Sequence, residues 1–237
     1  MKRRAELIVA LDTASRDRAL GLVRTLRGQI SLFKVGLELY TAVGPSIVKD
    51  LKDLGAEIFL DLKYHDIPNT VARASAEAAR LGVSMLDVHL SGGATMVRRA
   101  VDEVEAVCSL NRIQRPVLLG ITLLTSLGEE SLASLGLQRT PLEQVLTLAA
   151  LGKDAGLDGV VASPRELAAL RSKLGPDFIL VTPGIRPEGS SADDQSRTLT
   201  PREAVEAGAD YLVVGRPITG AENPSLAARE ILRAIIL

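Results

Sequence analysis

The sequence predicts an α/β protein folded as a single (β/α)8 TIM barrel over residues 1–237. Eight short runs rich in β-forming residues alternate with eight segments rich in Ala, Leu, Arg and Glu, which is the pattern of βα units on a parallel sheet. Several short runs are almost continuous in Val, Ile and Leu, as expected of strands buried on both faces. A chain of 237 residues is also a common length for one such barrel.

The elements follow one another without a linker. The expected strands are residues 7–12, 32–36, 57–63, 85–90, 117–122, 159–163, 178–184 and 211–215, and the expected helices are residues 16–27, 45–54, 70–81, 94–109, 141–155, 164–173, 201–207 and 225–236. Gly55, Gly82, Gly156 and Gly208 each fall where a helix gives way to a strand, as C-terminal caps or turns. An open, doubly wound sheet is the alternative, but no Gly-x-Gly-x-x-Gly turn follows the first strand to bind a dinucleotide.

Two segments depart from the simple alternation. Residues 126–141 form a polar insertion with an expected short helix. Residues 186–200 form a Ser/Asp/Gly-rich loop after the seventh strand, long and polar enough to act as a lid.

The composition narrows the possible partners. Hydrophobic residues make up 46% of the chain and charged residues 24%, which predicts a soluble globular protein. The net charge of -1 provides no general attraction to nucleic acid or to an anionic membrane, and aromatic residues, at 3%, are too few for stacking on single strands. Cys108 is the only cysteine, which excludes an internal disulfide and fits the reducing cytoplasm. No apolar run has the length of a signal peptide core or a membrane span.

Charged and hydrogen-bonding side chains gather at the C-terminal ends of the first five expected strands. In a barrel these ends surround one opening, where active sites lie. Singly, Asp12 could cap the next helix, Lys34 could be a surface lysine and His89 a hydrogen-bonded wall residue. Together, several carboxylates and lysines at one opening form an alternating array that can support acid/base chemistry. The residues are Asp12, Lys34, Asp61, Lys63, Asp87, His89, Thr122 and Thr125.

The third strand carries the densest set of charges. In an alternating strand Asp61 and Lys63 share one face. Asp66 follows in the loop, Pro68 stops the strand pattern, and Thr70 can cap the helix that comes next. Taken alone, this spacing is equally compatible with a surface ion pair beside a turn.

The ends of the seventh and eighth strands have the features of a phosphate site. The segments 182–186 and 213–218 provide glycines and exposed backbone N–H groups, together with Arg186 and Arg216. Barrels often bind phosphate at these two loops, and arginine adds a planar fork of donors. Gly215 allows the backbone to approach a ligand closely.

With these residues in place, the chain closely resembles the orotidine 5'-monophosphate decarboxylase family over essentially its whole length. The most specific motifs are residues 61–70 (DLKYHDIPNT), 32–36 (LFKVG), 182–187 (TPGIRP), 193–197 (DDQSR) and 214–218 (VGRPI). The resemblance implies decarboxylation of orotidine 5'-monophosphate to uridine 5'-monophosphate and CO2, the last step of de novo synthesis of that nucleotide. It also implies that no metal or organic cofactor is used.

The resemblance further implies a role for each matching residue. Lys63 resembles the acid that protonates C6 of the pyrimidine, and Asp61 the carboxylate set beside the substrate carboxylate. Lys34 and Asp12 resemble ligands of the ribose hydroxyls. Asp66, with Ile67 and Thr70, resembles the part that a homodimer lends to the partner's site. The remaining substrate contacts implied are Thr125 or the nearby Thr122 for the pyrimidine, and Pro183, Arg186, Gln195, Gly215 and Arg216 around the phosphate.

Two other functions are compatible with such a barrel. One is a related enzyme that acts on a sugar phosphate with Mg²⁺, which would be sensitive to a chelator. The other is a nucleotide-binding module without catalysis, which would bind the nucleotide without turnover; the presence of Lys34, Asp61, Lys63 and Asp66 argues against it.

Overall fold

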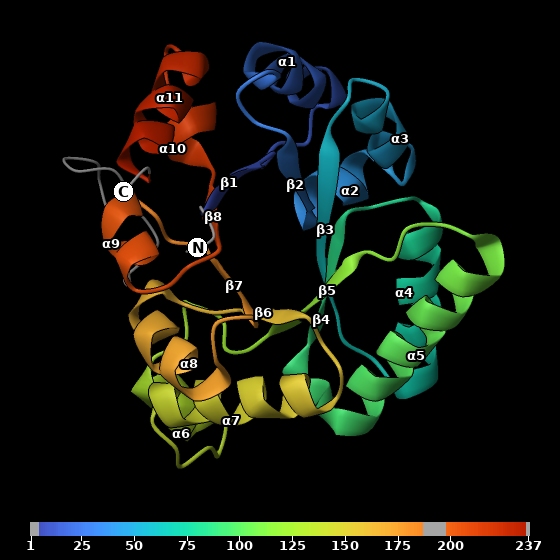
Figure 1. Ribbon diagram of the computed structural model, residues 1–237, viewed down its shortest axis with the longest axis vertical. Coiled ribbons are helices and arrows are strands. Elements are labelled where there is room, and N and C mark those ends of the chain that lie inside the picture. Colours follow the sequence, from blue (N-terminus) through green and yellow to red (C-terminus); the bar gives the residue numbers. More distant parts are fainter. Residues whose placement is uncertain (1–4, 187–197, 236–237) are drawn as a thin grey trace.

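Eight parallel strands close into a barrel, with helices around it (Figure 1), in a computed structural model that describes residues 5–186 and 198–235. Each strand pairs with the next along the chain, and β1 also pairs with β8. The expected (β/α)8 barrel is therefore confirmed. The strands are β1 (Glu6–Ala10), β2 (Leu32–Gly36), β3 (Glu57–Tyr64), β4 (Met85–His89), β5 (Val117–Ile121), β6 (Gly159–Val161), β7 (Ile179–Thr182) and β8 (Tyr211–Val214).

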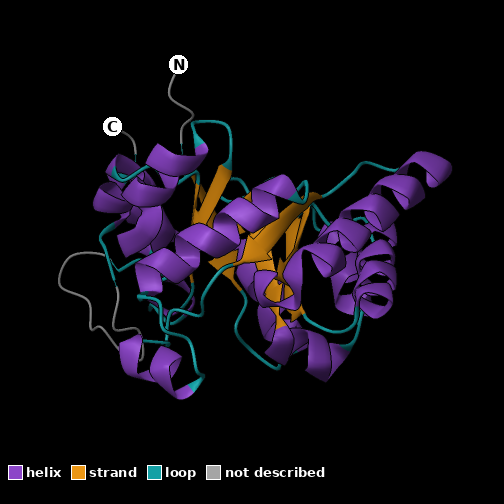
Figure 2. Ribbon diagram, turned by 90° about the horizontal axis from the view of Figure 1, so that it is seen from below, coloured by secondary structure: helices purple, strands orange, loops and turns teal. Residues whose placement is uncertain are grey.

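Helices cover the outside of the barrel, as the orange strands enclosed by purple helices show in Figure 2. Two short 3₁₀ helices, η1 (Leu90–Gly92) and η2 (Pro164–Glu166), follow β4 and β6. The α-helices are α1 (Arg16–Leu26), α2 (Leu37–Val43), α3 (Ser46–Lys52), α4 (Pro68–Arg80), α5 (Gly93–Asn111), α6 (Glu129–Ser134), α7 (Pro141–Asp154), α8 (Leu167–Leu174), α9 (Pro201–Glu206), α10 (Arg216–Thr219) and α11 (Pro224–Ala234).

The buried apolar residues form two clusters, one on each face of the sheet. A small cluster, with Ile8, Phe59 and Leu119 among its members, consists of alternate strand residues inside the barrel. A larger cluster joins the outward-facing strand residues, such as Val35 and Leu86, to the helices. This double burial explains why the strands are nearly continuous in apolar residues. The inner cluster also closes the barrel below its C-terminal end, where polar side chains replace apolar ones.

Local sequence signals define several helix starts. The hydroxyls of Thr140 and Thr200 each accept a hydrogen bond from the backbone N–H three residues later, and the carboxylates of Glu143 and Glu203 accept one from the backbone N–H of the threonine. A proline follows each threonine at the first helical position, where its missing N–H costs nothing. All four glycines expected at helix ends, from Gly55 to Gly208, have positive φ.

The structure corrects several expected boundaries. Six strands end one or two residues earlier than expected, and Asp12, Thr122 and Ser163 therefore lie in the loops beyond β1, β5 and β6. Helices α2 and α10 were not expected, since each follows a strand without an intervening turn signal. Thr70 is not the cap of α4: Ile67 holds that position and Pro68 begins the helix, so Thr70 lies within its first turn. The short helix in the polar insertion is confirmed as α6.

Candidate active site

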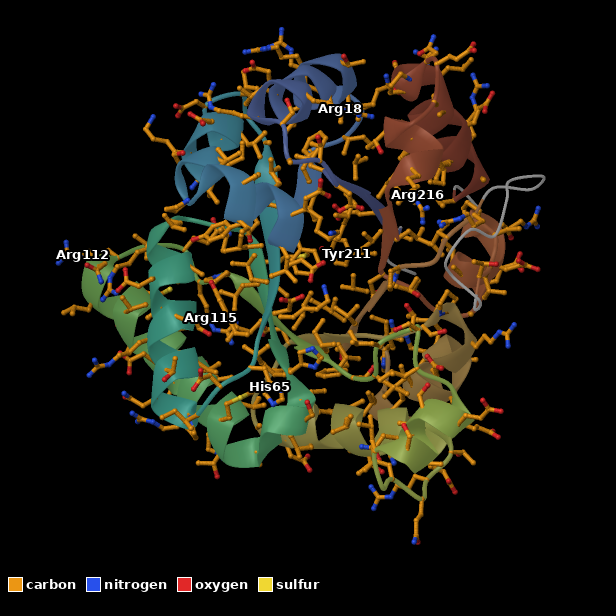
Figure 3. The ribbon with its side chains drawn as sticks, turned by 180° about the vertical axis from the view of Figure 1, so that it is seen from behind. Arg18, His65, Arg112, Arg115, Tyr211 and Arg216 are labelled. Atoms are coloured by element: carbon orange, nitrogen blue, oxygen red, sulfur yellow. The ribbon has the colours of Figure 1, made fainter. Side chains whose placement is uncertain are left out.

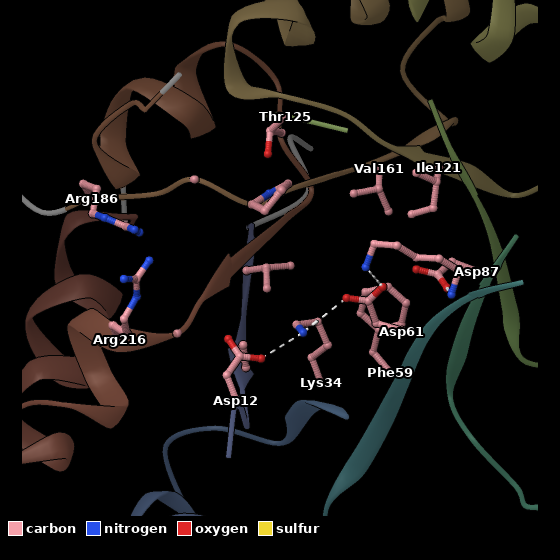
Figure 4. Close-up of a pocket in the computed structure, with 16 residues that line it drawn as sticks. Asp12, Lys34, Phe59, Asp61, Asp87, Ile121, Thr125, Val161, Arg186 and Arg216 are labelled. Carbon is pink, nitrogen blue, oxygen red and sulfur yellow. Dashed lines mark hydrogen bonds and ion pairs between the residues drawn. The ribbon is translucent and has the colours of Figure 1, made fainter. Parts of the chain in front are cut away.

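A cavity of about 240 Å³ opens at the C-terminal end of the barrel (Figure 4). Its wall consists of inward-facing strand residues and of the loops that follow the strands, as expected for a TIM barrel. Polar and apolar side chains both contribute. The lining residues are Ala10, Asp12, Lys34, Phe59, Asp61, Lys63, Asp87, Ile121, Thr125, Val161, Pro183, Gly184, Arg186, Val213, Gly215 and Arg216.

Four charged side chains form a chain of alternating sign along this wall. Lys34 Nζ lies 3.2 Å from Asp12 Oδ1 and 3.2 Å from Asp61 Oδ2. The other oxygen of Asp61 accepts a hydrogen bond from Lys63 Nζ. Asp61 is therefore held between two ammonium groups, that of Lys34 on the neighbouring strand β2 and that of Lys63 two residues further along β3 (Figure 4). The structure brings together the Asp12, Lys34, Asp61 and Lys63 expected at the rim.

Burial and the ion-pair partners have opposite effects on the pKa values of the two central side chains, Lys34 and Asp61. Burial favours neutral Lys34, but the charges of Asp61 and Asp12 outweigh it and raise the pKa of Lys34. Burial likewise favours neutral Asp61, but Lys34 and Lys63 hold the pKa of Asp61 well below its usual range. Both groups are consequently charged at neutral pH.

Lys63 has an unusual backbone conformation. Its φ is 52°, in the left-handed region that costs a residue with a Cβ about 1–2 kcal/mol. The register of β3 against β4 shifts between Leu60 and Tyr64, so the strand bulges there. The N–H of Lys63 donates to Asp87 Oδ1 at 2.8 Å rather than to a strand carbonyl. Lys63 thus reaches the cavity from a bulge, not from the regular alternating strand expected from the sequence.

Two arginines occupy the other side of the cavity. Arg186 follows β7 and Arg216 follows β8, and Figure 4 shows both guanidinium groups across the cavity from Asp61. A Cβ on Gly215 would lie 3.1 Å from Asp12 Oδ2, closer than most side chains tolerate, so glycine allows this strand end to approach the charged chain. Arg216 also lies on the far side of the barrel from His65 (Figure 3). The cavity therefore has the alternating Asp12–Lys34–Asp61–Lys63 chain on one side and two arginines on the other.

The two threonines after β5 differ in their surroundings. Thr122 is 3% exposed, and its hydroxyl donates to Val161 O at 2.8 Å. Thr125 lines the cavity, between the arginines and the apolar pair Ile121 and Val161 in Figure 4. Of the two expected pyrimidine contacts, Thr125 is the one with access to a ligand.

The structure adds apolar cavity residues that the sequence analysis did not name. Asp87, which the sequence placed in the charged array without a role of its own, is 0% exposed and lies on the strand next to that of Asp61. Phe59, Ile121 and Val161 contribute apolar side chains to the cavity wall. The alternation of strand residues indicates that they point inward, but which inward residues reach the open end depends on the stagger of the strands.

The described part of the chain contains no cluster of three or more His, Cys, Asp or Glu side chains suited to a metal ion. Within the same residues, no helix is both long and apolar enough to span a bilayer.

Comparison with known proteins assigns the family. The model of the orotidine 5'-phosphate decarboxylase / HUMPS family matches residues 5–231. The chain belongs to this family. The orotidine 5'-phosphate decarboxylase of Syntrophotalea carbinolica is 50% identical over 232 residues, which are 98% of this chain and 95% of that protein. That of Moorella thermoacetica is 49% identical over 237 residues, covering 99% of this chain and 94% of that protein.

Solved structures agree with this assignment. The crystal structure of orotidine 5'-phosphate decarboxylase from Lactobacillus acidophilus matches with a TM-score of 0.87 at 37% identity, covering 98% of this chain and 100% of that one. The membership in the orotidine 5'-phosphate decarboxylase family that the motifs predicted is confirmed.

Some residues matched to the family motifs lie outside the cavity. Asp66, Ile67 and Thr70 are exposed, with Ile67 68% exposed, and none of them lines the cavity of their own chain. Pro183 does line it. Gln195 lies outside the described residues, together with most of the expected lid loop. The backbone pairing of Ile185 with Leu199 holds the described ends of that loop together.

Proposed function

We propose that this protein decarboxylates orotidine 5'-monophosphate to uridine 5'-monophosphate and CO2 in pyrimidine biosynthesis, without a metal or organic cofactor. The observation that carries the proposal is the pairing, in one cavity, of the Lys34–Asp61–Lys63 chain with two arginines on the opposite side. A nucleotide monophosphate has matching ends: a dianionic phosphate and a pyrimidine, separated by a ribose.

Lys63 is the proposed proton donor. When CO2 leaves the pyrimidine, the electron pair of the broken bond stays on C6. An ammonium group beside that carbon stabilises the developing negative charge and then transfers a proton to it, forming the new C–H bond. Lys63 regains its proton from solvent after the products leave. The Lys63 ammonium pairs with Asp61, which is ionised.

Asp61 would lie beside the carboxylate of the substrate. Lys34 and Asp12, in contact with each other through a 3.2 Å ion pair, would receive the ribose hydroxyls. Arg186 and Arg216 would hold the phosphate with charge-assisted hydrogen bonds. Thr125 would contact the pyrimidine from the loop after β5.

The phosphate end contributes to the rate as well as to binding. Enzymes typically lower barriers by about 8–23 kcal/mol, whereas one charged hydrogen bond contributes about 1.5–3 kcal/mol. Lys63 alone is therefore insufficient. Binding energy from the phosphate, which does not react, can hold the pyrimidine against the charged chain and offset the repulsion between its carboxylate and Asp61.

A homodimer in the cytoplasm completes the proposal. Asp66, Ile67 and Thr70 are exposed and do not line the cavity of their own chain, which supports a role in the site of a second subunit. The large exposed side chain of Ile67 suits burial in such an interface.

The deciding experiment is a spectrophotometric assay of orotidine 5'-monophosphate consumption by the purified protein, with and without an excess of a metal chelator. Equal, rapid turnover in both conditions is expected. Turnover abolished by the chelator would contradict the metal-independent chemistry. Binding of uridine 5'-monophosphate without any turnover would instead indicate a nucleotide-binding module.

A further inference from the structure

The bulge in β3 leaves the backbone N–H of Lys63 without a partner in the sheet. Leu60 pairs with Leu86, and the next pair is Tyr64 with Val88. Between these pairs, β3 contains three residues and β4 contains one, which is Asp87. The ordinary ladder therefore cannot satisfy every amide of β3 in this stretch.

The side chain of Asp87 takes the place of the missing ladder acceptor. Its Oδ1 accepts the hydrogen bond from Lys63 N at 2.8 Å. Asp87 is 0% exposed, and its carboxyl group can hydrogen-bond with that of Asp61 when it carries a proton. Asp87 also belongs to the cavity wall beside Asp61 (Figure 4). Complete burial of a carboxyl group is costly, so its presence here calls for a role.

We propose that Asp87 is a positioning residue for the reaction: its carboxyl group holds the left-handed backbone of Lys63 and thereby aims the Lys63 ammonium at Asp61 and the reacting carbon. The proposal rests on the proposed function and adds a residue to it. Without the acceptor, Lys63 N would be buried and unsatisfied, and the backbone would relax towards a regular strand.

The charges around Asp87 support its neutral form. Asp61 and Lys63 face it from β3, and its neighbours on β5, Leu119 and Ile121, are apolar. Burial and the nearby Asp61 carboxylate raise the pKa of Asp87 well above its ordinary value. Two adjacent carboxylates do not both ionise easily, and Asp61 is the one stabilised by two lysines. When Asp87 is neutral, no second negative charge competes with Asp61 for the two lysines.

This role makes a distinctive prediction for isosteric substitutions. Asparagine has the shape of a neutral aspartic acid, with an oxygen that can accept from Lys63 N and an N–H₂ in place of Oδ2. Leucine has a similar size but offers no acceptor. If the position of Lys63 depends on the acceptor, Asp87→Asn should function and Asp87→Leu should not.

The test measures kcat and KM for orotidine 5'-monophosphate in the wild type, Asp87→Asn, Asp87→Leu and the control Met85→Leu. Met85 also faces the barrel interior from β4 but does not line the cavity. We expect Asp87→Asn and the control to keep kcat within about threefold of the wild type, and Asp87→Leu to lose about 100-fold in kcat with little change in KM, as for a displaced general acid.

Circular dichroism establishes that each variant keeps its fold, and binding of uridine 5'-monophosphate establishes that each variant still binds the phosphate end of the nucleotide. If Asp87→Leu does not fold, Asp87→Ala replaces it with the same expected loss. A 100-fold loss in Asp87→Asn, or near-normal kcat in the folded variant without an acceptor, overturns the role of Asp87. An inactive wild type contradicts the proposed function instead, so the two failures are distinguishable.

Discussion

Lys63 has a backbone conformation that its own sequence disfavours and a side chain on which the proposed chemistry depends. The left-handed φ of 52° is retained because the Asp87 carboxyl accepts its N–H and the Asp61 carboxylate accepts its ammonium. Strain of this kind persists at a site only where the surrounding contacts determine the conformation. Three predictions concern single side chains.

Lys63→Ala should lower kcat by about 10³-fold or more, since a general acid typically contributes 10²–10⁴-fold and its charge is lost as well. The protein should stay folded, because alanine removes a side chain that is 30% exposed. Lys49→Ala is the control, since Lys49 forms an exposed pair with Asp53 far from the cavity. Steady-state kinetics decide the matter: near-normal turnover of Lys63→Ala would remove it from the acid role.

Arg216→Ala should mainly weaken substrate capture, raising KM by about 10- to 100-fold, the equivalent of one charge-assisted hydrogen bond of about 1.5–3 kcal/mol. The exposed Arg99 on α5 provides a matched charge control. Inhibition by inorganic phosphate should weaken in parallel. An unchanged KM would place the phosphate elsewhere.

Asp87 should give the wild type a pH-dependent stability that Asp87→Asn lacks. Burial and Asp61 raise its folded-state pKa, so the folded protein keeps a proton that the unfolded chain releases above a pH of about 4. The stability from that proton is complete below the unfolded pKa and is lost as the pH rises through the folded pKa. Asparagine cannot lose the proton, so the melting temperature of Asp87→Asn relative to the wild type should rise between pH 4 and pH 7. A constant difference would show that Asp87 does not titrate in this way.

At the scale of elements, the end of the barrel opposite the cavity is held by two similar ion pairs. Asp158, before β6, accepts from Leu118 N and from Arg115, and Asp210, before β8, accepts from Leu180 N and Arg171. Each carboxylate therefore joins two neighbouring strands at their starts. Arg171 extends the second of these contacts by donating to the carbonyls of Gly175, Phe178 and Gly208.

Arg171→Ala should lower the free energy of unfolding by about 2–3 kcal/mol, because several backbone carbonyls and the Asp210 carboxylate lose a partly buried charged donor. Its control is Arg202→Ala on α9, whose pair with Glu206 is exposed and contributes little. Urea denaturation compares the two. Equal effects would show that the extended contacts of Arg171 add nothing to stability. Activity at saturating substrate should be unchanged in the folded fraction of both variants.

At the scale of the whole molecule, the barrel gathers distant segments at one opening and leaves the Asp66 loop outside it. The proposed dimer predicts complementation between two inactive variants, Lys63→Ala and Asp66→Ala. In a mixed dimer, one site would combine the intact Lys63 of one subunit with the intact Asp66 of the other.

Random mixing of the two variants should restore about a quarter of the wild-type activity, because half of the dimers are mixed and one of their two sites is complete. Mixed dimers form only if the subunits dissociate and reassociate. Mass measurements on differently tagged subunits detect the mixed dimers. The unmixed variants serve as the baseline. Verified mixed dimers without activity would show that Asp66 acts within its own chain.

Much of this protein follows from local sequence patterns. The apolar runs predicted the eight strands, and their C-terminal ends predicted that Lys34 and Asp61 lie at the opening of the barrel. The motifs after β7 and β8 placed Arg186 and Arg216 at the opening. Thr70 was misassigned as a cap because Ile67 and Pro68 begin the helix earlier, and the choice between Thr122 and Thr125 depended on a hydrogen bond to β6 that no local pattern indicates.

The amino-acid sequence by itself determined the barrel, the family and most of the charged chain, because periodicity and short motifs depend on neighbours along the chain. Only the tertiary structure decided how Lys63 reaches the cavity. The bulge at Lys63 and the buried acceptor from Asp87 arise from the pairing of β3 with β4, between residues 24 positions apart. Interactions at that separation are determined by how the strands are staggered as the barrel closes, and the spacing of residues within either strand does not reveal them.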